Sequence, residues 1–177
     1  MTTLVFIDGN DLRRDEVAQI IAGVDVRIEA LTAGFATSAP EPDHKARDKV
    51  AAHPSPEMCF AEAVDITTLD GRSLRLELDS ENANRFCKWW RETPAHLHLR
   101  VAYRRPGSDA IAVIGATCVG RIANKPAGAL SHGWDRLFVP DGDEDATLAE
   151  LAEQGIVAPF RRAAYVELAR ALGLAEA

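Results

Sequence analysis

Strand-like and helix-like apolar patterns alternate along this chain, and this alternation constrains its fold more than any other feature. The apolar run Leu4 to Ile7 is followed by a polar turn, and apolar residues then return at near-helical spacing up to Gly23. Val24 to Leu31 alternates between apolar and polar side chains, as a half-buried strand does. The chain therefore opens with a strand, a turn, a helix and a second strand.

The middle of the chain predicts further strands. Met58 to Thr68 has the composition of a strand, and after a turn Leu74 to Leu78 alternates in the same way. His96 to Tyr103 and Ala110 to Val119 flank a loop rich in proline, glycine and serine, which is typical of a hairpin. We expect these last two segments to pair as antiparallel strands.

Four further helices are predicted. Residues 43–52 form a short one between prolines, and residues 84–92 an amphipathic one that must end before Pro94. Thr147 with Glu150 three residues later matches a capping box, which marks a helix start. The last helix spans about residues 160–172. Helix and strand units at the start, a hairpin in the middle and helices at the end predict an α/β fold with a mixed sheet and helices on its faces.

Length and charge limit the protein further. A chain of 177 residues suits a single domain, here residues 1–177. The formal net charge of −7 argues against broad binding of nucleic acids, which needs a basic surface, but allows a small anionic ligand held by a few arginines.

The cysteines and the absence of targeting signals favour a cytoplasmic protein. The three cysteines, Cys59, Cys87 and Cys118, are widely spaced and predict neither a disulfide framework nor a zinc site. The first residues lack the basic start and the long apolar core of a signal peptide, and no apolar stretch is long enough to span a bilayer.

The segment Ser131 to Gly142 has the residues to recognise a nucleobase. Gly133 lets a backbone approach closely, Trp134 offers a ring for stacking, worth roughly 1–3 kcal/mol, and Asp135 can accept hydrogen bonds from ring N–H groups. The alternative is a core tryptophan beside an aspartate in a turn.

Motifs at both ends of the chain resemble those of the inosine triphosphate pyrophosphatase family. At the C-terminal end they are Gly133-Trp134-Asp135, Phe138-Val139-Pro140-Asp141-Gly142, Thr147-Leu148-Ala149-Glu150-Leu151 and Phe160-Arg161. At the N-terminal end Phe6-Ile7-Asp8-Gly9-Asn10-Asp11-Leu12-Arg13 is similar to the Thr-Gly-Asn-x-x-Lys opening of that family. The resemblance spans nearly the whole chain.

The resemblance implies a fold and an activity. It implies an elongated mixed sheet, two lobes with a nucleotide in the central cleft between them, and a homodimer. The activity is the Mg²⁺-dependent hydrolysis of a non-canonical or modified nucleoside triphosphate to the monophosphate and pyrophosphate. A partner other than a small-molecule nucleotide, such as a membrane, is not implied.

The turn after the first strand is the candidate phosphate site. A turn that leads into a helix directs backbone N–H groups and the positive end of the helix dipole at an anion. Asn10 lies in this turn, and Arg13 and Arg14 follow in the first helical turn, where a guanidinium could grip a phosphate. Arg13 occupies the position of the family's lysine.

Hydrolysis needs carboxylates, and these residues are harder to assign. Without a gap, the family's key aspartate falls on Ala61; a shift of one residue gives the role to Glu62, with Asp65 as the second candidate. Glu62 would also bind the metal, together with Glu41 or Glu29 upstream. The alternative is that these carboxylates are solvated groups at strand edges.

Base recognition is expected from Gly133, Trp134 and Asp135, with Arg161 as the arginine of the family's Ser-His-Arg run. Several polar residues of the family are replaced, namely by Pro159, Phe160, Gln154 and Arg136. These replacements leave two interpretations: the site binds a different nucleotide, or it binds one without hydrolysing it, as a sensor or partner subunit would.

Overall fold

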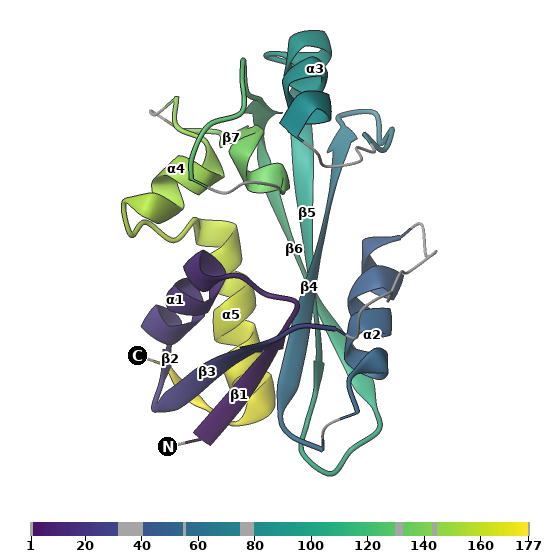
Figure 1. Cartoon of the computed structure of the whole chain (residues 1–177), viewed down its shortest axis with the longest axis vertical. Helices are drawn as coiled ribbons and strands as arrows, with labels where there is room; N and C mark the ends of the chain where they lie inside the picture. Colours follow the sequence, from purple (N-terminus) through teal and green to yellow (C-terminus); the bar gives the residue numbers. More distant parts are fainter. Residues whose placement is uncertain are drawn as a thin grey trace. The chain divides into compact units, whose positions relative to one another are not determined.

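The computed structural model describes residues 2–31, 41–54, 56–74, 80–129, 133–142 and 145–176. Strands and helices alternate as the apolar pattern predicts (Figure 1). In chain order the elements are β1 (Thr2–Ile7), α1 (Asp11–Ile20), β2 (Ile21–Ala22), β3 (Val24–Glu29), α2 (Pro42–Ala52), β4 (Cys59–Thr68), α3 (Ser80–Trp90), β5 (Pro94–Arg104), β6 (Ile111–Ile122), the 3₁₀ helix η1 (Trp134–Arg136), β7 (Phe138–Pro140), α4 (Leu148–Glu153), α5 (Pro159–Leu172) and β8 (Ala175–Glu176).

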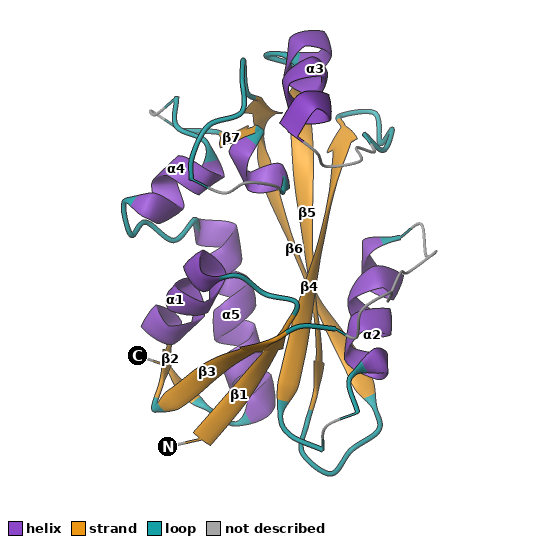
Figure 2. Ribbon diagram, in the orientation of Figure 1, coloured by secondary structure: helices purple, strands orange, loops and turns teal. Residues whose placement is uncertain are grey.

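Six of the strands form one mixed sheet, in the order β3-β1-β4-β5-β6-β7. β1 pairs in parallel with both β3 and β4, whereas β6 pairs antiparallel with β7. β1 and β3 lie side by side in Figure 2. The predicted α/β class with a mixed sheet is confirmed. β2 and β8 form a separate antiparallel pair.

The chain divides into two compact units. Unit 1 contains residues 1–63, 99–116 and 159–177, and unit 2 contains residues 64–98 and 117–158. The long strands β4, β5 and β6 each contribute residues to both units. A single domain over residues 1–177 and a cleft between two lobes both stay predictions.

In unit 1 helices cover both faces of the sheet. On one face α2 packs its Ala46 and Val50 against Val5, Ile7 and neighbouring small strand residues. On the other face Phe6 and Phe60 stack with ring centroids 4.3 Å apart. Figure 1 shows α2 on one side of β4 and the pair α1 and α5 on the other. Successive side chains of β1 thus point to opposite faces of the sheet, and each face is covered by helices.

In unit 2 the core is built around aromatic and leucine side chains. Phe86 of α3, Phe138 of β7 and Leu148 of α4 are all buried. α4 begins at the predicted capping box: the Thr147 hydroxyl accepts from the Glu150 N–H, and the Glu150 carboxylate accepts from the Thr147 N–H. This confirms the helix start that the sequence predicts.

Some boundaries differ from the expectation. α3 begins at Ser80 and ends at Trp90, two residues before the predicted end, and the chain then turns through Glu92 at φ = 57°. The predicted strand Leu74 to Leu78 lies mostly outside the described residues, although Ser73 before it forms a single antiparallel bridge with Thr67. Among the described residues no helix is long and apolar enough to cross a bilayer.

Candidate functional site

The buried face of α1 carries two charged residues. Arg13, Glu16, Val17 and Ile20 are the buried residues of this helix, and their spacing places them on one face. The Arg13 guanidinium donates to the Glu16 carboxylate, and both side chains are at most 5% exposed. A buried charge is costly unless it is paired, so Arg13 and Glu16 form a mutually compensating pair.

Arg161 of α5 joins this pair to β4. Its Nε lies 3.7 Å from Oε2 of Glu16, and its Nη1 donates to Oε2 of Glu62 at 3.2 Å. The Tyr165 hydroxyl, one helical turn further along α5, donates to Oε1 of Glu62 at 2.6 Å. Burial, followed by the nearby charge of Glu62, raises the pKa of Tyr165 well above its ordinary value, so this hydroxyl stays protonated and donates.

We call these five residues, Arg13, Glu16, Glu62, Arg161 and Tyr165, the charge network. It brings together three predicted site residues that are far apart in the sequence: Arg13, Glu62 and Arg161. Its two arginines and two glutamates balance, and the Arg161 side chain is only 1% exposed. The network therefore links α1, β4 and α5 inside unit 1, and its central side chain, Arg161, is closed to solvent.

The sequence predicts a phosphate site in the turn between β1 and α1, and the contacts within the described chain fix the shape of this turn. Asn10 is the N-cap of α1, and its side-chain oxygen accepts from the Arg13 N–H at 3.0 Å. Gly9 is required because a Cβ there would lie 2.5 Å from the Phe6 ring. Asp8 adopts φ = 55°, a left-handed conformation that aspartate tolerates better than most residues. Lys49 of α2 forms an ion pair with Asp8 at 2.9 Å.

Arg14 is more exposed than Arg13. Its guanidinium lies 2.8 Å from both Asp11 and Asp15, and the side chain is 37% exposed. The two arginines that the sequence places together thus have different environments. The Arg13 side chain points into the charge network, whereas the Arg14 side chain is partly exposed and lies between two carboxylates.

The order of strands places this turn at a particular point of the sheet. From β1 the chain crosses through α1 to β3 on one side of β1, and later reaches β4 on its other side. α1 and α2 therefore cover opposite faces, and the strand order reverses between β1 and β4. In open α/β sheets ligands bind outside the carboxyl ends of the strands at such a switch point.

The predicted metal ligands are not brought together around one cation. Glu62 and Asp65 are three residues apart on β4, so their side chains leave opposite faces of the strand. Asp65 accepts from the Ser73 hydroxyl, at 3.2 and 3.1 Å to its two oxygens. Glu41 is exposed, at the start of α2 on the face opposite the charge network.

Glu29, the alternative upstream ligand, is also engaged. Its carboxylate lies 2.6 Å from His53 Nε2 and 2.5 Å from Arg27, and these contacts lower the pKa of Glu29. Over the described residues as a whole, no three His, Cys, Asp or Glu side chains group closely enough to hold a metal ion. Glu62, beside a guanidinium and with both oxygens bonded, is a poor fit for Mg²⁺.

Unit 2 contains the predicted base-recognition residues. Gly133 adopts φ = 101°, which only glycine reaches readily, and leads into η1. Trp134 is 9% exposed and packs edge-on against Phe86, with ring centroids 5.4 Å apart. Asp135 is 8% exposed. Most of the indole is therefore in the core of unit 2, and its role as a stacking surface stays a prediction.

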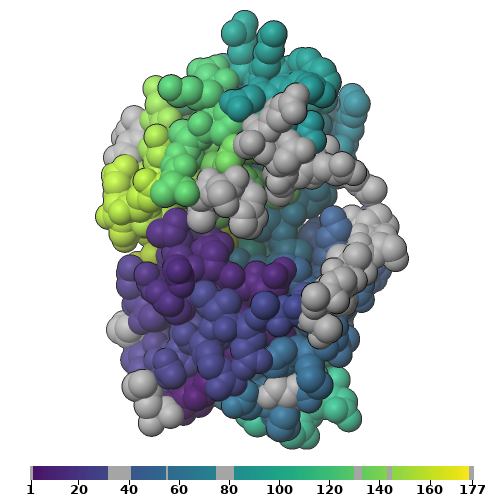
Figure 3. Space-filling model, viewed as in Figure 1, coloured from purple at the N-terminus to yellow at the C-terminus, as the bar shows by residue number. Residues whose placement is uncertain are grey.

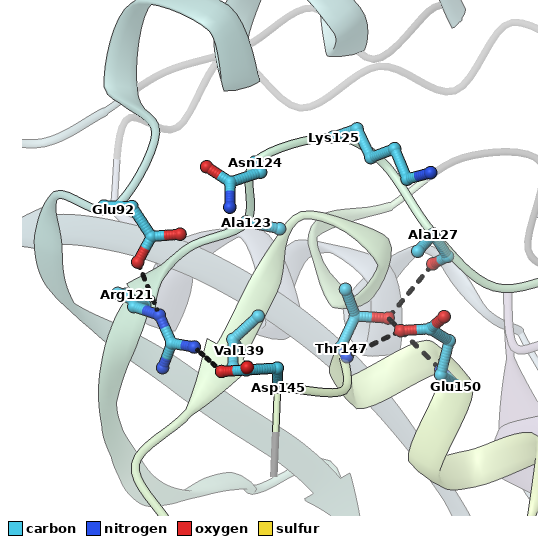
Figure 4. A pocket seen from close by; sticks show the side chains of 10 residues that line it. All are labelled: Glu92, Arg121, Ala123, Asn124, Lys125, Ala127, Val139, Asp145, Thr147 and Glu150. Atoms are coloured by element: carbon cyan, nitrogen blue, oxygen red, sulfur yellow. Dashed lines mark hydrogen bonds and ion pairs between the residues drawn. The ribbon is translucent and has the colours of Figure 1, made fainter.

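A separate cavity of about 360 Å³ lies in unit 2, beside β6 and the start of α4 (Figure 4). Arg121 spans part of it, paired with Glu92 at 2.9 Å and with Asp145. Thr147 and Glu150, also in its wall, are engaged in the capping box. Its lining carries charges of both signs, most of them already paired.

Four residues replace polar groups of the resembled family, and each of them lies at a helix end or in a packing contact. Pro159 is the first residue of α5, where a missing N–H costs nothing, and the Phe160 ring lies 5.3 Å from the Arg161 guanidinium. Gln154 caps the end of α4, and Arg136 ends η1. These four positions therefore serve helix ends and packing.

Sequence reasoning missed three residues of this region: Glu16, Lys49 and Tyr165. Glu16 follows Arg13 at helical spacing, and that pattern could have identified it. Lys49 and Tyr165 carry no local signal, because their partners Asp8 and Glu62 are far away in the sequence.

Comparisons with known proteins agree with this fold. The model of the Ham1 family matches residues 70–169. A dITP/XTP pyrophosphatase from Anaeromyxobacter sp. (strain Fw109-5) is 29% identical over 108 residues, which cover 58% of this chain and 46% of that protein. The chain thus matches about half the length of this curated relative.

Solved structures extend the likeness to nearly the full chain. A HAM1 protein from Coxiella burnetii has a TM-score of 0.67 at 17% identity, covering 98% of this chain and 99% of that one. The Ham1 protein of Staphylococcus aureus has a TM-score of 0.62 at 17% identity, with 96% and 97% covered. At this identity the likeness establishes the fold. Because the family model covers more than half of the sequence, the chain belongs to the Ham1 family of inosine triphosphate pyrophosphatase-like proteins.

Proposed function

We propose that this chain is a divergent nucleoside triphosphate pyrophosphatase, which hydrolyses a non-canonical or modified triphosphate to the monophosphate and pyrophosphate. The observation that carries the proposal is the position of the Asp8 to Arg14 turn. It lies at the carboxyl end of β1, where the strand order reverses, and it opens a helix whose N–H groups can hold phosphate oxygens. In the space-filling view the atoms of the β1–α1 segment reach the surface of unit 1 (Figure 3).

The chemistry proposed is an in-line displacement. A water oxygen bonds to the α-phosphorus, and the bond from that phosphorus to the bridging oxygen breaks. Pyrophosphate leaves with the electron pair, and the proton that the water loses passes to the solvent. In this proposal the first-turn amides donate to the phosphate oxygens, and Arg14, which is paired with Asp11 and Asp15, contributes a guanidinium at the edge of the site. Mg²⁺, expected from the family, would offset the charge of the triphosphate when bound. The charge network positions α1 and α5 for this task.

A second candidate function is nucleotide binding without hydrolysis. The observation that favours it is the bonding of Glu62, since both of its oxygens already accept from Arg161 and Tyr165. A carboxylate held in this way is poorly placed to activate a water. A chain of this kind would act as a sensor or as a partner subunit.

A product assay in Mg²⁺ tests the proposal. The substrates are canonical and deaminated purine and pyrimidine triphosphates and modified analogues, and the assay distinguishes pyrophosphate from single phosphate. We expect pyrophosphate from at least one non-canonical or modified triphosphate. Release of single phosphate would contradict the reaction proposed. Calorimetric binding of a nucleotide without any product would support the second candidate.

Two further expectations belong to the same proposal. A homodimer is proposed by family resemblance, and sedimentation at micromolar concentration would show it. A cytoplasmic location is proposed because Cys59, Cys87 and Cys118 are all free thiols, which suits a reducing compartment.

A further inference from the structure

Asp8 is a carboxylate at the point where the proposed function requires phosphates to bind. It directly follows β1, whose last residue Ile7 is paired with Ala61 of β4. Asp8 therefore lies beside the Ala61–Glu62 step, at the switch point between these two strands. Its side chain is 51% exposed, so the group is accessible to a ligand from solvent.

The cations around this turn are compensated. Lys49 is paired with Asp8, Arg14 with Asp11 and Asp15, and Arg13 with Glu16. These seven side chains carry four negative and three positive charges. A free triphosphate would therefore meet a turn without excess positive charge, and would lie within a few ångströms of the Asp8 carboxylate.

A divalent cation would remove the repulsion between the triphosphate and the Asp8 carboxylate. Mg²⁺ in nucleotide sites is bound by one or two carboxylates together with phosphate oxygens and waters. Asp8 fits that role better than Glu62, because its side chain is half-exposed and its ion pair with the Lys49 ammonium is formed through Oδ2. Glu62 is 11% exposed and held by a guanidinium and a phenol.

We propose that Asp8 makes nucleotide binding depend on a divalent cation: it repels the metal-free triphosphate and shares the cation of the metal complex with the phosphates. This inference rests on the proposed function, because it assumes that a nucleotide binds at the β1–α1 turn. It concerns binding, so it holds for both the hydrolytic and the non-hydrolytic candidate.

Calorimetry with Asp8→Asn tests the inference. Asparagine also tolerates positive φ, so the turn is kept while the charge is removed. The ligand is inosine triphosphate with a methylene group in place of the α–β bridging oxygen, titrated in Mg²⁺ and in EDTA. In the unaltered protein Mg²⁺ should strengthen binding at least tenfold. In Asp8→Asn the two affinities should agree within about threefold, mainly through stronger binding in EDTA.

Asp15→Asn is the matched control. It removes one negative charge from an exposed carboxylate of α1, which is paired with Arg14 as Asp8 is paired with Lys49. The Mg²⁺ dependence of binding should be kept in this variant. If Asp8→Asn binds with an unchanged Mg²⁺ dependence, or if Asp15→Asn loses it equally, the inference is wrong while the proposed function stands. If none of the three proteins binds the nucleotide in either buffer, both proposals fail.

Discussion

Tyr165 shows how much the charge network depends on a single hydroxyl. Arg161 and Glu62 lose most of their hydration in unit 1, and a buried ion pair is stable only when its remaining polar atoms are also bonded. Tyr165 provides that bond to the second oxygen of Glu62. Tyr165 therefore contributes to the stability of the fold through one hydrogen bond to the charged carboxylate of Glu62.

We expect Tyr165→Phe to lower the free energy of unfolding by about 1.5–3 kcal/mol near pH 7, the range for a hydrogen bond to a charged group. The raised pKa of Tyr165 sets the pH dependence. The hydrogen bond from protonated Tyr165 contributes its full stabilisation below the pKa of tyrosine in the unfolded chain, about 10. This contribution is lost as the pH rises above that value towards the raised pKa of the folded protein. Urea unfolding from pH 7 to 11 should show the unaltered protein losing stability more steeply above pH 10. Parallel profiles for the two proteins would contradict this role.

The three thiols should differ in reactivity. Burial raises the pKa of Cys59, and burial raises the pKa of Cys87 to about 11, whereas Cys118 is partly exposed. A disulfide reagent at pH 8 should therefore label Cys118 rapidly, and the other two only after unfolding. Mass spectrometry of the labelled peptides identifies each site. Rapid labelling of Cys87 in the folded protein would show that its environment is more open than described.

At the scale of elements, the helix start with a capping box was the best predicted feature. Thr147 and Glu150 carry a local hydrogen-bonding signal, and the structure confirms the helix start that it predicts. The side-chain cap at Asn10 was not predicted, although a turn followed by a helix was expected there. The short strands β2 and β7 were not predicted, because two or three residues carry no periodicity. The end of α3 was misplaced, since the turn at Glu92 precedes Pro94 and ends the helix earlier.

The capping box of α4 should contribute measurably to stability. Besides accepting from the Glu150 N–H, the Thr147 hydroxyl donates to the Ala127 carbonyl at 3.1 Å, and the residue is buried. We expect Thr147→Ala to lower the unfolding free energy by about 1–2 kcal/mol. Thr147→Ser keeps the hydroxyl and should lose less than half of that amount in the same urea titration. Equal losses in both variants would mean that the methyl group, and not the cap, matters.

At the scale of the whole molecule, the sequence could not predict which candidate residues meet. Arg13, Glu62 and Arg161 come together because β4 lies beside β1 and α5 packs near α1, and local periodicity does not encode strand order. The same order creates the switch point that gives Asp8 its importance. Trp134 was predicted from its motif, but the burial of its ring depends on the packing of α3 against η1.

Both candidate functions require a nucleotide whose phosphates bind at the turn between β1 and α1. This binding position can be tested by amide hydrogen exchange in Mg²⁺, measured with and without the inosine triphosphate analogue that carries a methylene group at the α–β bridge. We expect slower exchange at Gly9, Asp11 and Leu12 when the nucleotide binds, and Mg²⁺ alone is the control. A nucleotide that binds by calorimetry but leaves the exchange of these amides unchanged would contradict this binding position.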